Sequence, residues 1–106
     1  MAVVYEKERA PRVEIDPSVE PFLAKRPQLR PLLPPALENA RIHFPVAPLR
    51  LIVERDPDDY AWETLVFEFD TREEDGMEKA LAFMSDGLAP LIRECPAEIV
   101  AVNVWH

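Results

Sequence analysis

Residues 51–70 decide the fold, and they read LIVERDPDDYAWETLVFEFD. Beginning just before this stretch, apolar residues occupy every second position in two sets. The first set is Leu49, Leu51 and Val53, and the second is Leu65, Phe67 and Phe69. A period of two is typical of β-strands that bury one face. Between the two sets, DPDDYA contains the Asp-Pro and Asp-Asp pairs of a turn, although it is longer than the tight two-residue type. The stretch therefore predicts a β-hairpin with an acidic tip.

Two helices are predicted before the hairpin. Asp16 and Pro17 suit a helix start, because Asp accepts hydrogen bonds from free amides and Pro is tolerated at the first helical position. A short helix is expected over residues 17–25. Four prolines between residues 27 and 35 prevent one continuous helix, and the last two suit the opening of a second helix over residues 34–44.

A long amphipathic helix is predicted after the hairpin. Apolar residues between Met77 and Leu91 recur at spacings of three and four, which is the period of a helix with one buried stripe. Thr71 is expected to cap its start, with Glu74 as the reciprocal partner. Pro90 is expected to kink this helix or to begin a separate final turn, with Asp86-Gly87 as the alternative break.

The closing run AEIVAVNVW (97–105) predicts a last strand. Its valines at 100, 102 and 104 are expected to share the core face, and its residues at 99, 101, 103 and 105 the opposite face. Because strand–helix–strand crossovers are nearly always right-handed, the last strand is expected beside the first hairpin strand. The predicted fold is α+β: two N-terminal helices, a β-hairpin, an amphipathic helix and a final strand, with a three-stranded sheet of order 2-1-3. Residues 1–15 form an N-terminal arm, either loose or an edge strand, and residues 16–106 form a single domain.

Composition narrows the functional classes. The chain has 106 residues, 12 prolines against 2 glycines, and a formal net charge of −8. Such a charge disfavours nucleic acid, because phosphate binding needs clustered Lys and Arg. No apolar run reaches the length of a bilayer span, and the N-terminus lacks a signal-peptide core, so no membrane association and a cytoplasmic location are expected. Acidic residues concentrate between Glu54 and Glu78.

The usual catalytic motifs are missing. The sequence has no glycine-rich phosphate loop, no GxSxG and no HExxH. The single cysteine, Cys95, follows a predicted helix, whereas reactive thiolates favour helix N-termini or neighbouring cations. His43 is expected to flank the end of its helix. We therefore expect no catalytic residue and no cofactor.

One carboxylate cluster leaves an alternative open. Glu68 and Asp70 lie two apart on a strand and point to the same side, and Glu54 is expected near them on the neighbouring strand. Such a cluster can hold a divalent metal or act as an acid–base pair. The alternative function is thus a small metal-binding or enzymatic domain; otherwise these acids simply solvate a sheet face.

The second face of the predicted sheet is unusually apolar. If helices cover one face, Ile52, Val66, Ile99, Ala101 and Trp105 remain on the other, and Tyr60 and Trp62 lie beside the hairpin tip. Aromatic residues are favoured anchors at protein interfaces. The predicted interface residues are Ile52, Val66, Ile99, Trp105, Tyr60 and Trp62. A two-fold homodimer covers such a face, and Val66→Asp is expected to dissociate it.

The runs LIVERDPDDYAWETLVFEFDT, EKALAFMSDGL and AEIVAVNVW together give a resemblance. They resemble small uncharacterised prokaryotic proteins that are sometimes encoded beside toxin-like partners, as antitoxin-type components. The resemblance covers about residues 35–105, and the proline-dense segment 27–35 departs from it. It implies partner binding and offers no catalytic motif to carry over. The expected function is an acidic, self-associating protein-interaction module whose hairpin meets a basic partner.

Overall fold

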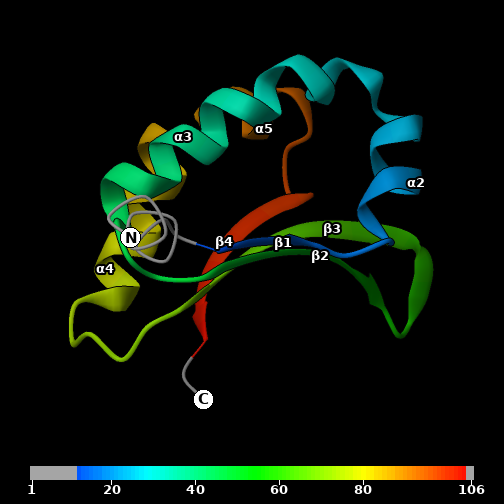
Figure 1. Cartoon of the computed structure of the whole chain (residues 1–106). Helices are drawn as coiled ribbons and strands as arrows, with labels where there is room; N and C mark the ends of the chain where they lie inside the picture. Colours follow the sequence, from blue (N-terminus) through cyan, green and yellow to red (C-terminus); the bar gives the residue numbers. More distant parts are fainter. Residues whose placement is uncertain (1–11, 105–106) are drawn as a thin grey trace, which may run out of the picture.

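The computed structural model describes residues 12–104, which form a four-stranded mixed sheet with helices packed against one face (Figure 1). The predicted α+β class is confirmed. In chain order the elements are β1 (Val13–Ile15), α2 (Val19–Lys25), the 3-10 helix η1 (Pro27–Leu32), α3 (Leu33–His43), β2 (Leu49–Asp56), β3 (Asp59–Asp70), α4 (Gly76–Asp86), α5 (Ala89–Glu94) and β4 (Ile99–Val104).

The predicted hairpin is the antiparallel pair β2–β3. Leu51 lies opposite Phe67, so the two apolar sets share one face, as the alternation predicts. The turn is tighter than expected, because Asp56 pairs with Asp59 and only two residues separate them. The Asp58 N–H donates to Asp56 Oδ1 at 2.8 Å, and this local bond helps to close the turn.

The predicted three-stranded sheet of order 2-1-3 is wrong. The sheet has four strands in the order β1-β2-β3-β4, and β4 pairs in parallel with the second hairpin strand, β3. The place beside β2 is occupied by β1, which runs parallel to it. Backbone bonds at both ends hold β1 there: Leu49 N–H donates to the Arg12 oxygen at 2.8 Å, and Asp16 N–H to the Leu51 oxygen at 2.9 Å.

The two crossovers of this sheet have opposite hands. The connection from β1 to β2 and the connection from β3 to β4 both pass over the same sheet face, on which all the labelled helices lie (Figure 1). Strands β3 and β4 run antiparallel to β1 and β2, yet both crossovers step across the sheet in the same direction, from the β1 edge toward the β4 edge. One crossover is therefore left-handed, the rare case. A handedness rule alone could not have given this order.

The structure has two helices after the hairpin, α4 and α5, and the start of α4 differs from the prediction. The prediction that Pro90 begins a separate final turn is confirmed, because α5 begins at Ala89 with Pro90 in its first turn. The helix before it, α4, ends at Asp86, the alternative break. The predicted capping by Thr71 and Glu74 is wrong, since α4 begins only at Gly76. Thr71 Oγ1 instead accepts the Glu73 N–H at 3.2 Å, in a turn that precedes the helix.

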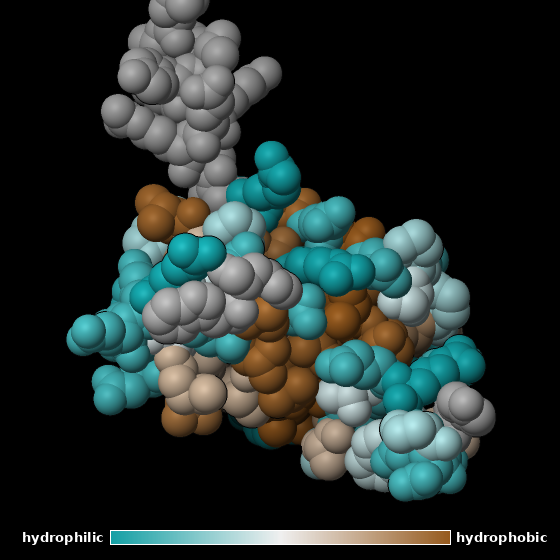
Figure 2. All heavy atoms as spheres, turned by 90° about the horizontal axis from the view of Figure 1, so that it is seen from below, coloured by the Kyte–Doolittle hydropathy of each residue, from teal (hydrophilic) through white to brown (hydrophobic). Residues whose placement is uncertain are grey.

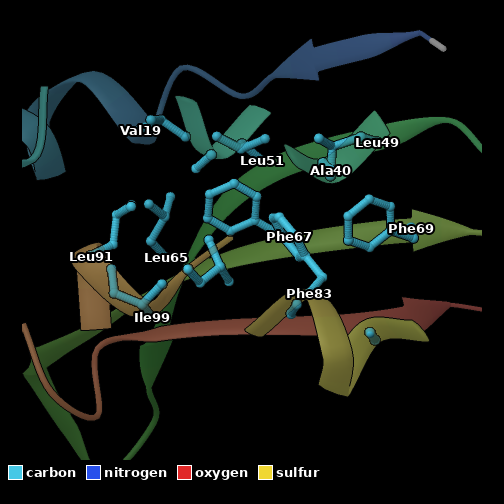
Figure 3. Close-up of a cluster of buried hydrophobic side chains, with 14 of the residues drawn as sticks. Val19, Ala40, Leu49, Leu51, Leu65, Phe67, Phe69, Phe83, Leu91 and Ile99 are labelled. Atoms are coloured by element: carbon cyan, nitrogen blue, oxygen red, sulfur yellow. The ribbon is translucent and has the colours of Figure 1, made fainter. Parts of the chain in front are cut away.

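The core fills the space between the sheet and the helices (Figure 3). Four buried phenylalanines lie at one end of it. Phe44 stacks on Phe69 with ring centroids 3.9 Å apart, and Phe83 of α4 meets Phe69 edge-on at 5.3 Å and Phe67 at 5.7 Å. Edge-on aromatic pairs such as those made by Phe83 add to the free energy of area burial.

Asn103 and Gly76 fix the start of α4 above β4. The carbonyl oxygens of Thr71 and Phe69 assign the orientation of the Asn103 side-chain amide: its nitrogen donates to them, at 3.1 Å and 3.0 Å. A Cβ at Gly76 would lie only 2.3 Å from the nearest atom of this amide. Because Asn103 cannot turn away without losing both bonds, the close approach requires glycine.

We predict that Gly76→Ala destabilises the chain by about 1–3 kcal/mol, the usual cost of forcing extra volume into a packed contact. The free energy of unfolding, measured in urea, checks this. In an Asn103→Ala background the same change should cost much less, because the obstructing amide is gone. An equal loss in both backgrounds would contradict the explanation.

Candidate interaction surface

The sheet face away from the helices, here called the open face, is not covered by any described helix. Its centre is an apolar row of neighbouring side chains on three strands, Ile52, Val66 and Val100. Val102 and Val104 extend this apolar surface along β4. Figure 2 looks at this face and shows an apolar band between hydrophilic side chains. A sheet face this apolar is a candidate for binding another surface.

The predicted facing of the last strand is wrong. Ile99 and Ala101 are buried in the core, opposite Leu65 and Phe67. Ile99 therefore does not belong to an open-face interface, and the valines of β4 replace it there. Residues 97–105 include apolar side chains at both odd and even positions, so their alternation favours neither face. The register with β3 decides it, because partner residues in a parallel pair point to the same side.

The other predicted interface residues divide into three cases. Ile52 lies half-buried on the open face, and Trp62 lies half-exposed on the same face, beside a shallow hollow of about 310 Å³. Val66 is also on this face, but its neighbours leave only 2% of it exposed. Val66→Asp would therefore unfold the chain rather than only separate two copies. The side chain of Tyr60 and all of Trp105 lie outside the described residues.

Acidic side chains border the apolar row. Arg50 lies 3.8 Å from Glu68 and 3.7 Å from Asp16, which partly balances those two acids. Within residues 12–104, Glu54 and Asp70 form no ion pair. Among the described residues, the open face therefore carries two acids without an ion-pair partner beside its apolar surface.

The proposed metal-binding cluster is not assembled. Glu54 lies opposite Thr64, whereas Glu68 lies opposite Arg50, four residues away along β2. Four residues of strand span about 13 Å, well beyond the reach of one ion's ligand shell. Of the three proposed ligands, Glu68 and Asp70 share a hollow of about 280 Å³, which Glu14 and the two arginines Arg12 and Arg50 also line. Among the described residues no group of three metal-ligating side chains comes together.

We therefore predict that millimolar magnesium, calcium or manganese leaves the melting temperature of the chain unchanged, since a ligand stabilises a protein only through a native-state site. Differential scanning fluorimetry with and without each metal measures this. A rise of several degrees that Glu68→Gln abolishes would restore the metal-binding alternative.

Sequence reasoning missed a charge cluster on the core side of the sheet. Glu63 is buried, and its carboxylate lies 3.2 Å from Arg55, 3.5 Å from Lys25 and 3.6 Å from Arg26. Arg26 also donates to Glu98 at 2.6 Å. The alternation of the strand could have revealed it, because Glu63 is two residues before the buried Leu65 and therefore points to the same, core-facing side. These contacts join α2 to the hairpin and to the residue before β4.

The guanidinium of Arg26 is positioned by apolar packing as well as by charge. It lies over the Phe22 ring, 3.9 Å from the centroid, and donates to the Phe22 carbonyl oxygen at 3.3 Å. Every charge in this cluster has an opposite neighbour, so the cluster explains the attachment of α2 and indicates no ligand.

Replacing Glu63 tests that structural role. Glu63→Gln should lower the free energy of unfolding by about 1–3 kcal/mol, because the half-buried Arg26 then loses a charged neighbour. Glu74→Gln, which removes an equal charge from an exposed position, is the matched control and should change stability little. Chemical denaturation of both variants measures the difference. Equal stability of the two would show that the cluster contributes nothing.

The two side chains considered for nucleophilic chemistry are separated and structurally engaged. His43 ends α3, as predicted, and its Nε2 lies 3.3 Å from Asp86 Oδ2 in α4. Cys95 is buried at the end of α5, and burial raises the pKa of its thiol. A raised pKa keeps the thiol protonated at neutral pH, when it is a poor nucleophile.

Comparison with known protein families, with curated proteins and with solved structures finds no match to this chain. Within residues 12–104, every helix is too short or too polar to cross a bilayer. The resemblance to antitoxin-type components stays a prediction, and any function has to be argued from the open face itself.

Proposed function

We propose that this chain is a non-enzymatic protein-interaction module that binds a basic partner protein through its open face and also associates with a second copy of itself. The observation that supports this is the open face, which no described helix covers. There Ile52 and Val100 stay partly exposed on either side of the buried Val66, and Trp62 is 47% exposed. Removing apolar area from water contributes about 25 cal/mol per Å². Sheets with one solvated face normally carry polar residues there, so an apolar one favours a binding role.

The charge of the module selects the partner. The chain carries a net charge of −8, and Glu54 and Asp70 border the apolar row without an ion pair within the described residues. A partner with apolar side chains flanked by Lys or Arg complements both features. Charge complementarity of this kind speeds encounter and rejects acidic competitors more than it adds affinity.

An antitoxin-type role is the form of this function that the sequence resemblance implies. A component of that type binds and restrains one toxin-like partner protein. The open face supports such a role because it offers a single surface with both apolar and acidic parts. The biological partner would then carry a basic, partly apolar surface.

A capture experiment tests the proposal. Tagged wild-type chain is compared with Ile52→Lys/Trp62→Ala, which changes the open face, and with Ile42→Lys, which changes an exposed residue of α3 on the helix side. We expect one specific partner, bound by wild type and by Ile42→Lys, and bound at least about tenfold more weakly by the open-face variant. Because the attraction is partly electrostatic, raising the salt concentration should slow association.

The result is decisive in either direction once the captured protein is purified and its affinity measured with each variant. Equal binding by all three chains would remove the open face as the binding surface. Recovery of no specific partner at low salt, from the native host, would overturn the proposed function.

A further inference from the structure

The outer edge of β4 is unpaired within residues 12–104. Leu65 N–H donates to the Glu98 oxygen at 2.8 Å, which places the backbone groups of residues 98, 100, 102 and 104 toward β3. In a parallel pair the alternate residues direct their N–H and C=O groups to the other side. The backbone groups of Ile99, Ala101 and Asn103 therefore point outward, available to another strand.

The two edges of the sheet are protected very differently. β1 has only three residues, includes Glu14, and is flanked by Arg12 and by Asp16-Pro17. Short length, charge and proline are the usual means of preventing edge pairing. β4 has six residues, IVAVNV, with no charge and no proline. Only β4 retains the character of a strand that pairs with another chain.

A second apolar feature lies on the same border of the molecule. Met77 and Leu81 of α4 are 61% and 57% exposed and, four residues apart, lie on one flank of the helix. Asp86 lies 3.3 Å from His43 of α3. It follows Met77 by nine residues, about two and a half turns, so the two side chains lie on opposite sides of the helix. Met77 therefore faces away from α3. Since α4 packs over β4, this flank lies above the outer edge of that strand.

We infer that two copies of this chain associate about a two-fold axis, with β4 pairing antiparallel to β4 and the Met77–Leu81 flanks of α4 in contact. This inference rests on the proposed self-association and gives it a geometry. Pairing centred on Ala101 places Val100 opposite Val102 of the second copy and Ile99 opposite its Asn103, so no like charges meet. That matters for a chain with a net charge of −8, which repels its own copy elsewhere.

This arrangement leaves the open face accessible. The two sheets become continuous, and the valines of both β4 strands lie at the centre of one enlarged open face. A two-fold interface uses each contact twice, so the exposed Met77 and Leu81 are buried in both copies. The dimer therefore presents two acidic, apolar surfaces side by side for a partner.

Sedimentation equilibrium at about 100 µM, well above the micromolar scale of ordinary association, tests the interface. Wild type should be a dimer. Met77→Lys/Leu81→Lys should be a monomer, because the lysines of two copies would face one another. Ile42→Lys/Val46→Lys is the matched control, since these residues are 73% and 72% exposed and do not lie on the α4 flank, and it should remain a dimer. Circular dichroism confirms that each variant is folded.

Amide hydrogen exchange by NMR tests the strand pairing itself. The amides of Ala101 and Asn103 should be protected in the wild-type dimer and exchange rapidly in the monomeric variant, whereas those of Val100 and Val102 should be protected in both. A dimer that survives Met77→Lys/Leu81→Lys and leaves Ala101 unprotected would overturn this geometry alone. A wild-type chain that is monomeric would overturn self-association as well, while the capture experiment would still decide partner binding.

Discussion

The stacking of Phe44 on Phe69, 3.9 Å between ring centroids, is the contact on which the rest of the structure depends. Phe83 of α4 closes on the same ring at 5.3 Å, so one side chain of β3 joins the end of α3, the sheet and α4. Phe69 lies on the face that the apolar alternation of β2 and β3 buries, so its ring contacts attach α4 and the end of α3 to that face. Every described helix lies on that side, and none of them covers the opposite face.

The described helices cover only one face of the sheet, and this accounts for the features that we connect with function. The open face keeps an apolar row in its centre, and its acids lie at the border, where water still solvates them. At the edge of the sheet, β4 has no described neighbour beyond it and no charge of its own. The buried cluster around Glu63 has the opposite character, because matched charges there attach α2 and leave nothing for a ligand. Recognition is therefore expected on the sheet side of the molecule.

The strengths and failures of the sequence predictions have a common physical origin. The hairpin was correctly predicted because alternation in residues 49–70 is a local property with one apolar face. Prolines and Gly87 likewise marked helix ends locally. The last strand was assigned to the wrong face because it is apolar at both parities, and β1 was left uncertain because three residues are too few to show a period.

By itself the sequence determined the α+β class, the hairpin and its buried face, and three open-face residues, Ile52, Trp62 and Val66. Only the tertiary structure decided the sheet order, the replacement of Ile99 by the valines of β4, and the distance that separates Glu54 from Glu68. The reason is that periodicity records how a residue points within its own strand. Which strand becomes its neighbour, and in which register, depends on residues far away in the chain that compete for the same edge.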